Sequence, residues 1–564
     1  MEPRRIALAV VLMAMVLVVS QFLFPTAKPV PGSAPVATDS LTQVDSASAA
    51  RISTAVGNAA IATTTIAPPS TATASVPDTL VALPVDTTAT TTTRAVYRTT
   101  NRGAALIGAQ MTQFPTLTNR GRTKGDPAEL ANAGDPLLSF RLVVPGDTVR
   151  LDRQTFRTTR TDANGQTVVR YDATVAARAV AITYTFLPDS YRVNVAAEIA
   201  DAPTSAFLLV DLPPSFHSSE SDTTEDHTHL SYAYKPDKRN AKGIAFRSVD
   251  PGERQIASGP LTWAVAKSKY FLVGLLMPAG QTFAELDVTG GVRTAKQATR
   301  AQATAVLPLT NGTTAFEVYA GPQEFKRLVA MGREFETSNP YGGWLQGVVQ
   351  PFATIVIRLL LWMKATLGLG YGWILVLFGV AVRLILWPLN QKAMRSSMAM
   401  QRLQPELQAI QAKHKGDPQK LQVEMMRVYK EHGMSPFSSL SGCLPMLIPL
   451  PVFFALFFVF QNTIEFRGVS FLWLPDISVK DPYFVLPVLV AATAMILSFI
   501  GMKGVKANEQ QKMMMYMMPA MMLFIFFSMA SGLNLYYLVQ NLASLPQQWL
   551  IAQERGRAVP VVKG

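Results

Sequence analysis

Five long apolar segments near the end of the sequence constrain its fold more than any other feature. They lie at about 371–389, 440–462, 483–500, 513–529 and 533–550. Each is close to the ~20 residues that a helix needs to cross the hydrocarbon core of a bilayer. Charged residues make up 16% of the chain, against roughly 25% in soluble proteins. The pattern therefore predicts an α-helical polytopic membrane protein with a five-helix core over 370–550.

The loops between these segments alternate in charge. Lys and Arg gather in 390–432, in 501–512 and in the basic tail 551–564, whereas 465–482 is nearly balanced and 530–532 carries no charge. Loops rich in Lys and Arg stay in the cytoplasm, so the first three are expected there and the other two outside. The net charge of +13 is thereby explained by membrane orientation, and we expect no specific nucleic-acid partner.

The N-terminal part is expected to contain an anchor and a tether. In residues 1–24, Arg4 and Arg5 precede an apolar run longer than a usual signal-peptide core, and no good cleavage site follows. We interpret it as a retained transmembrane anchor, which gives six spans and puts both termini in the cytoplasm. Residues 25–100 are rich in Thr, Ala and Pro with little apolar periodicity, which predicts a disordered linker outside the membrane.

Alternating apolar and polar residues mark the segment 101–338. The runs "ARAVAITYTF" and "YRVNVAAEI" read as half-buried strands, and "DANGQ" reads as a turn between strands. This pattern predicts an all-β sandwich outside the membrane. His227 and His229 suggest a metal site, but no further ligands recur at metal spacing, so a solvated loop is expected. The chain has one cysteine, Cys443, which excludes internal disulfides.

The segment 340–366 is apolar but has one polar stripe. Gln346, Gln350, Thr354 and Arg358 recur at four-residue steps, as on one face of a helix. The stripe favours an amphipathic helix lying in the membrane interface. As a seventh span it would move the basic loop 390–432 to the outside, against the charge rule.

The cytoplasmic loop is expected to form a helical hairpin over 393–433. Two apolar stripes at helical spacing flank "KGDPQ", which supplies a glycine stop, an aspartate cap and a proline start. Two interpretations stay open for it: basic helices resting on anionic lipid, or a docking site for a partner.

Arg383 is the one charge inside the core spans. An arginine near the centre of a membrane helix costs roughly 2.5–3.5 kcal/mol on insertion scales, and no other span supplies an acid. A water-filled groove would explain it, lined by polar residues of the last two spans, each of which could equally be a helix-to-helix hydrogen bond. The candidates for this groove are Ser528, Asn534, Tyr537 and Gln540, with Asn541 and Gln461 as further possibilities.

The core contains sequence blocks that resemble the YidC/Oxa/Albino family of membrane insertases. They include "VRLILWPLNQKAMRSSMAMQRLQPELQAI", "GCLPMLIPLPVFFALF" and "SGLNLYYLVQNLASLPQQWLI". The resemblance implies a periplasmic β-sandwich of the galactose-mutarotase-like kind and a function in the bacterial inner membrane. That function is to insert nascent membrane proteins and help them fold, alone or with the Sec translocon. It also implies no enzymatic activity, no cofactor and no catalytic or metal residues; contact of the hairpin and basic tail with ribosomes stays open.

The resemblance also assigns residues. Arg383 matches the family's groove arginine, Tyr537 a groove tyrosine and Phe453 a substrate-contacting aromatic. A hydrophobic surface along which substrate slides is expected at Phe453, Phe457, Met522 and Phe526; ordinary lipid-facing surface is the alternative. Gly379 and Leu523 stand where the enterobacterial pattern has threonines, so those walls of the groove are expected to be less polar.

Two other functional classes fit the sequence less well. A secondary transporter or channel predicts inverted repeats and several ionisable residues near the midplane, and the sequence has neither. A membrane-anchored periplasmic sugar-binding protein rests on the sandwich alone and leaves the core spans unexplained. No phosphate-binding loop of the G-x-x-x-x-G-K-[ST] type occurs, so nucleotide hydrolysis is not expected to drive the activity.

Overall fold

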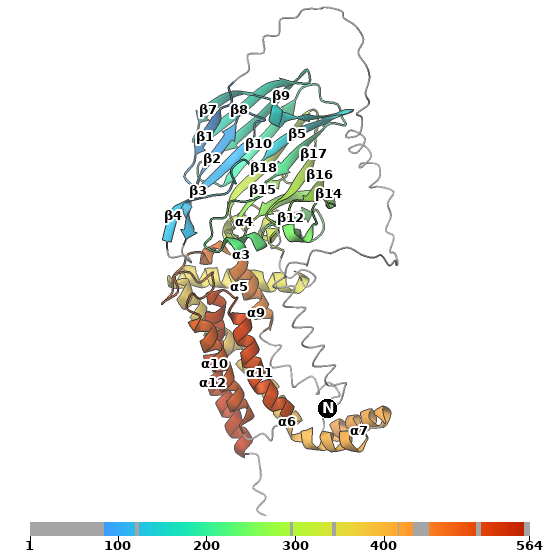
Figure 1. Ribbon diagram of the computed structural model, residues 1–564, viewed down its shortest axis with the longest axis vertical. Helices are drawn as coiled ribbons and strands as arrows, with labels where there is room; N and C mark the ends of the chain where they lie inside the picture. The colour runs from blue at the N-terminus through green and yellow to red at the C-terminus, as the bar shows by residue number, and fades with distance from the viewer. Residues whose placement is uncertain are drawn as a thin grey trace, which may run out of the picture.

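The computed structural model describes residues 84–118, 123–293, 297–340, 346–414, 417–431, 450–503 and 509–557. The predicted anchor 1–24, most of the linker, Cys443 and the end of the basic tail lie outside these residues. A β domain and a set of long helices meet end to end, with α5 (Gln346–Leu367) running across the junction (Figure 1).

The β domain contains two antiparallel sheets. The smaller sheet has the order β1-β2-β3-β4, and the larger has β6-β5-β11-β17-β16-β14-β15-β18-β10-β9-β8-β7, with β12 paired to β14 and β13 paired to β12. The small sheet consists of β1 (Thr87–Thr91), β2 (Ala95–Thr100), β3 (Leu106–Thr118) and β4 (Thr123–Glu129). The large sheet consists of β5 (Ser139–Val144), β6 (Asp147–Arg150), β7 (Arg157–Ala163), β8 (Gln166–Val175), β9 (Arg178–Phe186), β10 (Arg192–Ile199), β11 (Phe207–Leu212), β12 (Ser231–Pro236), β13 (Lys242–Ala245), β14 (Arg254–Lys267), β15 (Phe271–Leu276), β16 (Phe283–Gly290), β17 (Ala301–Pro308) and β18 (Thr313–Pro322).

The predicted all-β sandwich is confirmed, and its alternation holds at the level of single residues. In β10, Val193 and Val195 are buried while Asn194 between them is exposed. Two short helices, α3 (Thr223–Thr228) and α4 (Phe325–Ala330), lie at the end of the domain that faces the long helices (Figure 1). His227 lies in α3 and His229 at its C-cap, so the expected solvated loop at this position is wrong.

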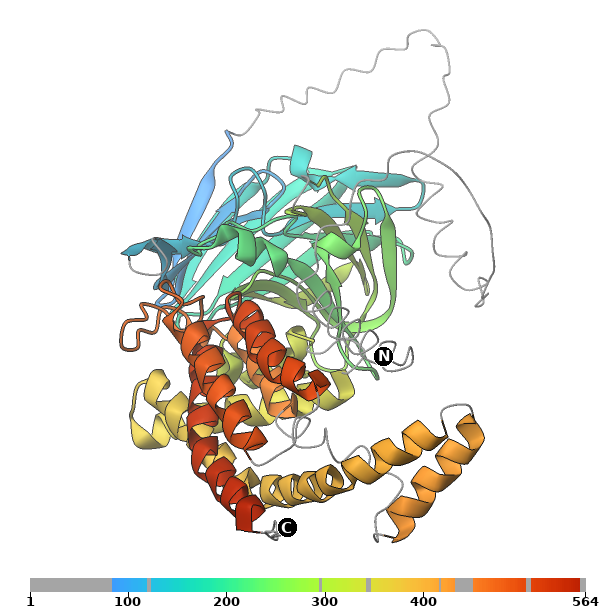
Figure 2. The same ribbon diagram turned by 60° about the horizontal axis from the view of Figure 1, so that its bottom comes forward.

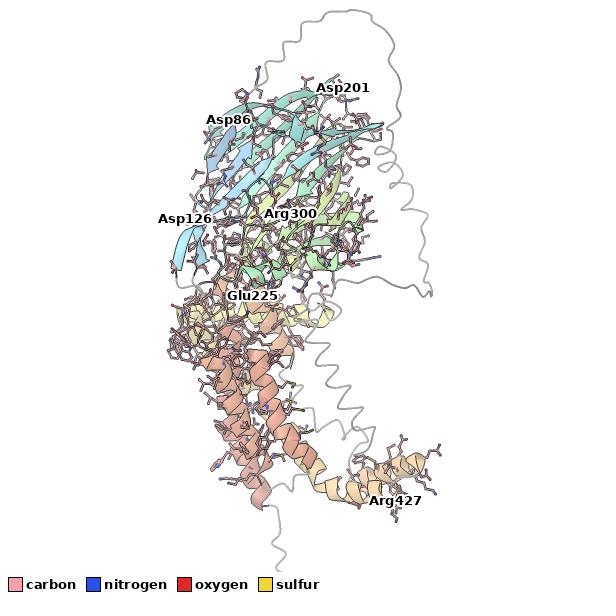
Figure 3. The ribbon with its side chains drawn as sticks, in the orientation of Figure 1. Asp86, Asp126, Asp201, Glu225, Arg300 and Arg427 are labelled. Carbon is pink, nitrogen blue, oxygen red and sulfur yellow. The ribbon has the colours of Figure 1, made fainter. Side chains whose placement is uncertain are left out.

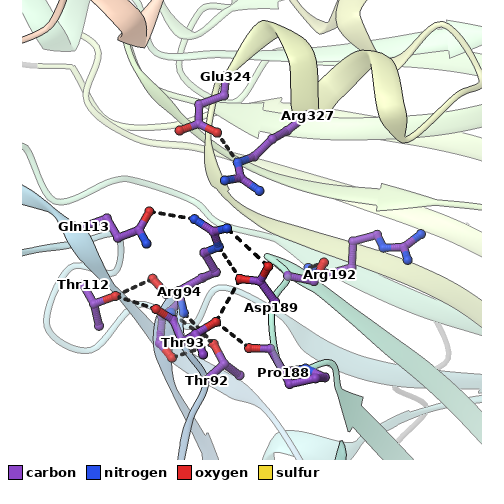
Figure 4. Close-up of polar contacts among 12 residues, drawn as sticks. Thr92, Thr93, Arg94, Thr112, Gln113, Pro188, Asp189, Arg192, Glu324 and Arg327 are labelled. Atoms are coloured by element: carbon purple, nitrogen blue, oxygen red, sulfur yellow. Dashed lines mark hydrogen bonds and ion pairs between the residues drawn. The ribbon is translucent and has the colours of Figure 1, made fainter.

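The domain begins earlier than the sequence suggested, because β1 and β2 occupy the last part of the predicted linker 25–100. Threonine-rich sequence is compatible with disorder, but β-branched threonine also favours strands, and Tyr97 is 1% exposed in the core. The β1–β2 turn is tied to the large sheet: Arg94 pairs with Asp189 at 2.6 Å, and the Thr93 hydroxyl donates to the Pro188 carbonyl at 2.8 Å (Figure 4).

The helices α6 (Tyr371–Lys413), α9 (Leu450–Asn462), α10 (Val485–Met502), α11 (Glu509–Phe526) and α12 (Ser531–Arg557) run away from the β domain (Figure 1). Helix α7 (Pro418–Glu431) lies at their far end, beside the last part of α6. Among the described residues, Tyr371–Lys392 of α6 and the whole of α10 are long and apolar enough to cross a membrane. The structure therefore supports a helical membrane region, while the expected number of six spans is not established by it.

Helix α6 corrects one expected boundary. The sequence suggested a span ending at 389 and a separate hairpin starting at 393, but α6 continues unbroken through both for 43 residues. Pro388 does not end it, and no glycine occurs between Gly379 and Gly416 to provide a stop. The end of α6 packs against α7 through Leu403, Leu407, Val428 and Tyr429, so the hairpin arms are the last part of α6 and α7 (Figure 2).

Helix α5 presents its polar stripe to the β domain. The Gln346 amide donates to the Ala241 carbonyl at 3.1 Å, and the Arg358 guanidinium lies 5.9 Å from the Phe325 ring centroid. Another face of α5 exposes large apolar side chains, with Ile355 and Trp362 each 61% exposed. A polar face on a protein domain and an open apolar face are what a helix in the membrane interface requires, so that placement remains our prediction.

Candidate functional site

Arg383 lies on α6 and contacts α12. Its Nη2 donates to Gln547 Oε1 at 2.6 Å, and Gln547 Nε2 in turn donates to the Trp387 carbonyl of α6 at 2.9 Å. Gln547 is 1% exposed. The Arg383 Nε is buried and has no hydrogen-bond partner among the described residues. The guanidinium is therefore held in place by a neutral amide, which orients the positive charge without neutralising it.

The acid of α12 does not reach this site. Glu554 pairs with Arg395 at 2.8 Å, and both side chains are well exposed. Arg395 lies twelve residues after Arg383 on the same helix, a separation of about 18 Å along the axis. Within the part of the chain that the structure describes, the charge of Arg383 is thus not paired with an acid.

Further polar residues of α12 share the face that meets α6. Gln540 Nε2 donates to the Gly379 carbonyl at 2.9 Å, one helical turn before Arg383, and to the Tyr536 hydroxyl at 3.1 Å. Gln540, Ser544 and Gln547 follow the i, i+4, i+7 spacing of one helical face. Sequence reasoning named Gln540 and missed Gln547, although this spacing was visible in the sequence and would have found it.

Two predicted groove residues lie elsewhere. Asn534 precedes Gln547 by thirteen residues, about 20 Å along α12, and its amide donates to the Phe526 carbonyl at 3.1 Å. Ser528 donates locally to the Ile525 carbonyl at 2.9 Å. Both are at the turn between α11 and α12, near the β domain. The structure therefore places Gln540 close to Arg383 and separates Ser528 and Asn534 from it.

Tyr537 belongs to an aromatic cluster that joins three helices. Its ring centroid lies 5.3 Å from that of Phe453 on α9 and 5.0 Å from that of Phe526 on α11. Phe457 is 4% exposed and Phe526 is 2% exposed, so these two expected slide residues are packed between helices. Phe453 and Met522 are only partly buried. Of the four expected slide residues, Phe453 and Met522 thus keep some exposed surface, and the sliding surface remains a prediction.

The loop 463–482 between α9 and α10 makes a buried contact with the β domain. Arg467 Nε pairs with Glu220 Oε1 at 2.7 Å, and the two side chains are 3% and 9% exposed. Arg467 Nη2 also donates to the carbonyls of Pro115 at 2.9 Å and Ser219 at 3.0 Å. Burial raises the pKa of Glu220 to about 7, although the Arg467 charge opposes this rise. The arginine therefore fixes the loop to the β domain through a desolvated ion pair.

Other charged groups complete this junction. Lys480 lies 3.4 Å from Asp222 and 3.9 Å from Glu225, and Glu225 pairs with Lys269 at 2.7 Å. Figure 3 shows Glu225 at the end of the β domain that meets the helices. Glu465 accepts the Phe325 N–H at 3.0 Å, and burial raises the pKa of Glu465 to about 7. Sequence reasoning selected none of these residues, because charged residues in a loop look like solvent-exposed ones until their partners are known.

The same loop also contacts the turn between α11 and α12. The Ser531 N–H donates to the Val479 carbonyl at 2.7 Å, and the Gly532 N–H donates to the Ile477 carbonyl at 2.8 Å. One short loop thus contacts both the β domain and the helices that carry the Arg383 site. In the described residues, no group of three or more His, Cys, Asp or Glu side chains is arranged to hold a metal ion.

Known protein families match most of this chain. A model of the 60Kd inner membrane protein family matches residues 362–557, and a model of the YidC periplasmic domain matches residues 88–355. The membrane protein insertase YidC of Chlorobium phaeovibrioides is 33% identical over 413 residues, which cover 68% of each chain. The chain belongs to the YidC family of membrane protein insertases.

Other known proteins are also similar to parts of this chain. The YidC insertase of Anaeromyxobacter sp. is 35% identical over 307 residues, and the match spans about half of either chain, 54% of this one and 53% of the relative. A crystal structure described as an active YidC insertase with the first transmembrane domain resolved has a TM-score of 0.33 and 19% identity, covering 82% of this chain and 92% of that one. A galactose mutarotase-like protein from Lactobacillus casei covers 42% of this chain with a TM-score of 0.29 and 10% identity. The YidC family consists of insertases and not enzymes, so membership favours insertion over transport or sugar binding.

Proposed function

We propose that this chain inserts nascent membrane proteins into the bacterial inner membrane. In this proposal the anchor 1–24 and five core helices cross the membrane, both termini are cytoplasmic and the β domain is periplasmic. Membership in the YidC family supports the activity, and the distribution of Lys and Arg among the loops supports the orientation.

The observation that carries the mechanism is the neutral partner of Arg383. Each charge on a translocated tail faces a cost of roughly 2.5–3.5 kcal/mol in the hydrocarbon. Arg383 retains a buried Nε without a partner among the described residues and shares its Nη2 with an amide oxygen. An acidic residue of the client would pair with this guanidinium in a low-dielectric setting, where the attraction is stronger than in water.

Gln547 is proposed as the positioning residue of this step. Its amide holds both the Arg383 guanidinium and the Trp387 carbonyl, so the side chain fixes the direction of the charge. Gln540 adds a polar contact one turn away. The apolar span of the client then leaves between α9 and α11 past Phe453 and Met522, and hydrophobic partitioning into lipid supplies the free energy.

The partners follow from the same arrangement. Nascent membrane proteins are the substrates, and we propose that some arrive through the Sec translocon. The hairpin formed by α6 and α7 and the basic tail 551–564 are proposed to contact anionic lipid and ribosomes, because both are basic and lie on the cytoplasmic side.

The test is insertion into liposomes that contain the purified full-length chain. The clients are two single-span proteins that differ only in whether the translocated tail carries acidic residues, and protease protection of the tail measures insertion. Full compensation of one charge at 2.5–3.5 kcal/mol corresponds to about 70- to 400-fold in rate. R383A should slow the acidic client at least tenfold, R383K should retain part of the rate, and the neutral client should change little.

R358A is the matched control, because Arg358 is an exposed arginine on α5 outside this site. Equal rates for both clients with R383A would refute the charge-attraction step. Solute flux through the same liposomes without insertion would support the transporter instead.

A further inference from the structure

The β domain contains a cleft of about 1350 Å³ that lies apart from the junction with the helices. Its lining comes from both sheets, with Thr87 and Arg98 from the small sheet and Thr148 and Arg150 from the large one. Figure 3 places Arg300, another lining residue, on the body of the domain above Glu225. The volume exceeds the roughly 300–1,000 Å³ of common small-molecule pockets, which suits an extended ligand.

Charged pairs cover the walls of this cleft. Four arginines of the lining each bond to a carboxylate of the lining: Arg98 to Glu129 at 2.6 Å, Arg141 to Asp211 at 2.5 Å, Arg150 to Asp152 at 2.7 Å and Arg300 to Asp135 at 2.6 Å. Paired side chains are held in fixed orientations and nearly cancel in charge. The walls thus offer ordered donors beside ordered acceptors, which fits a ligand that needs both, such as a peptide backbone or a glycan.

The rim of the cleft distinguishes these two ligands. β6 is an edge strand, because among the described strands it pairs with β5 alone. The two-residue turn at Pro145 and Gly146 makes Val144 and Asp147 the hydrogen-bonded closing pair of this hairpin. The alternation of antiparallel pairing then directs the backbone N–H and C=O of Thr148 and Arg150 toward the free edge. These are the two β6 residues that line the cleft.

The same lining is less suited to binding a glycan. Sugar rings usually stack on exposed aromatic faces, whereas the aromatic side chains of this lining are Phe140, which is 1% exposed, and His217. Backbone groups on a free strand edge are instead the element that proteins use to bind an extended peptide as an added strand.

We propose that this cleft binds an extended, hydrophilic polypeptide segment, which adds to the free edge of β6 and places its polar side chains among the arginine–carboxylate pairs. The occupant is the translocated part of a client, so its identity rests on the proposed insertion activity. The cleft would hold that segment on the outer side and hinder its return through the membrane.

Peptide binding is measured first, without any insertion step. The full-length chain in lipid nanodiscs is titrated against a fluorescent peptide of about ten polar residues, long enough to follow a strand edge, and anisotropy reports binding. Thr148→Pro removes the outward N–H and leaves the bonds to β5 intact. We expect at least a tenfold loss of affinity with T148P and none with T158P.

Thr158 is the matched control. It is a threonine of β7, the opposite edge strand of the same sheet, and the alternation counted from the closing pair Ala163 and Gln166 also makes it a non-hydrogen-bonded position. Unchanged affinity in T148P would overturn the proposal, as would failure of the peptide to bind while maltohexaose binds to the cleft.

A second experiment connects the cleft to clients. A photo-crosslinking amino acid replaces Thr148 or Thr158, and a client is arrested during insertion into proteoliposomes. We expect the translocated tail to crosslink at position 148 and not at position 158. If the client's tail becomes protease-protected but does not crosslink at position 148, the proposed role of the cleft is refuted and the proposed insertase function stands. Peptide binding that depends on Thr148, in a chain that inserts no client, supports the cleft as a peptide site and refutes the proposed function.

Discussion

Replacement of Arg467 by methionine tests whether the β domain is fixed to the helices. Arg467 and Glu220 are 3% and 9% exposed, so their pair counts as buried, and removal of one partner of a buried pair costs about 3–5 kcal/mol. R467M keeps the apolar volume and leaves Glu220 without its cation. This loss of free energy should favour opening of the loop 463–482, because Arg467 lies in that loop.

Hydrogen–deuterium exchange of the full-length chain in nanodiscs measures this opening. The Ile477 N–H donates to the Val469 carbonyl at 2.9 Å, so its exchange reports on whether the loop is closed. A loss of about 3–5 kcal/mol corresponds to roughly 150- to 5000-fold faster exchange. The double variant R467M/E220Q should recover most of the protection, since it removes the uncompensated carboxylate.

R254M serves as the control, because Arg254 pairs with Asp287 at 2.8 Å while 46% exposed and an exposed pair contributes about 0–1 kcal/mol. Exchange that rises less than tenfold in R467M would refute the reasoning. So would a double variant that is as open as the single one, because the damage would then not arise from the buried Glu220 charge.

Three further predictions concern the junction and the end of α12. Burial raises the pKa of Glu465 from 4.5 to about 7, so its contribution to stability is complete below pH 4.5 and is lost as the pH rises to about 7; E465Q should raise the melting temperature at pH 8 and change little at pH 4.5. G532A should destabilise the junction by about 1–3 kcal/mol, because an added Cβ would lie 2.4 Å from the Phe460 ring; chemical unfolding of the full chain checks this. E554Q breaks an exposed ion pair and should change stability by less than about 1 kcal/mol in the same assay.

The fold of the β domain was largely predictable, because alternation in strands such as β10 reports directly which side chains face the core. Its start was not predictable, since the threonines of β1 look the same in a tether and in a strand. Only their partners decide between the two, and Tyr97 packs against Phe186, nearly ninety residues later, with ring centroids 5.3 Å apart.

One residue of the candidate site, Arg383, was predictable from the sequence, whereas its partners were less so. Arg383 was evident because a lone charge in an apolar run is costly. Its partner Gln547 lies 164 residues away; the spacing of Gln540, Ser544 and Gln547 marks one polar face of α12 in the sequence, but only the structure shows that Gln547 is the residue that bonds Arg383. The junction residue Arg467 gave no signal, because Glu220 comes from a different domain and burial of the pair depends on how the two domains meet.

The unbroken course of α6 has a mechanical consequence. Its 43 residues form a stiff lever about 64 Å long, with the hairpin at one end and Arg383 part-way along it. A force on the hairpin would be transmitted along this one helix to Arg383 and to its contact with Gln547 on α12. In the proposed topology, binding of a partner at the hairpin would thus be coupled to the direction of the buried charge.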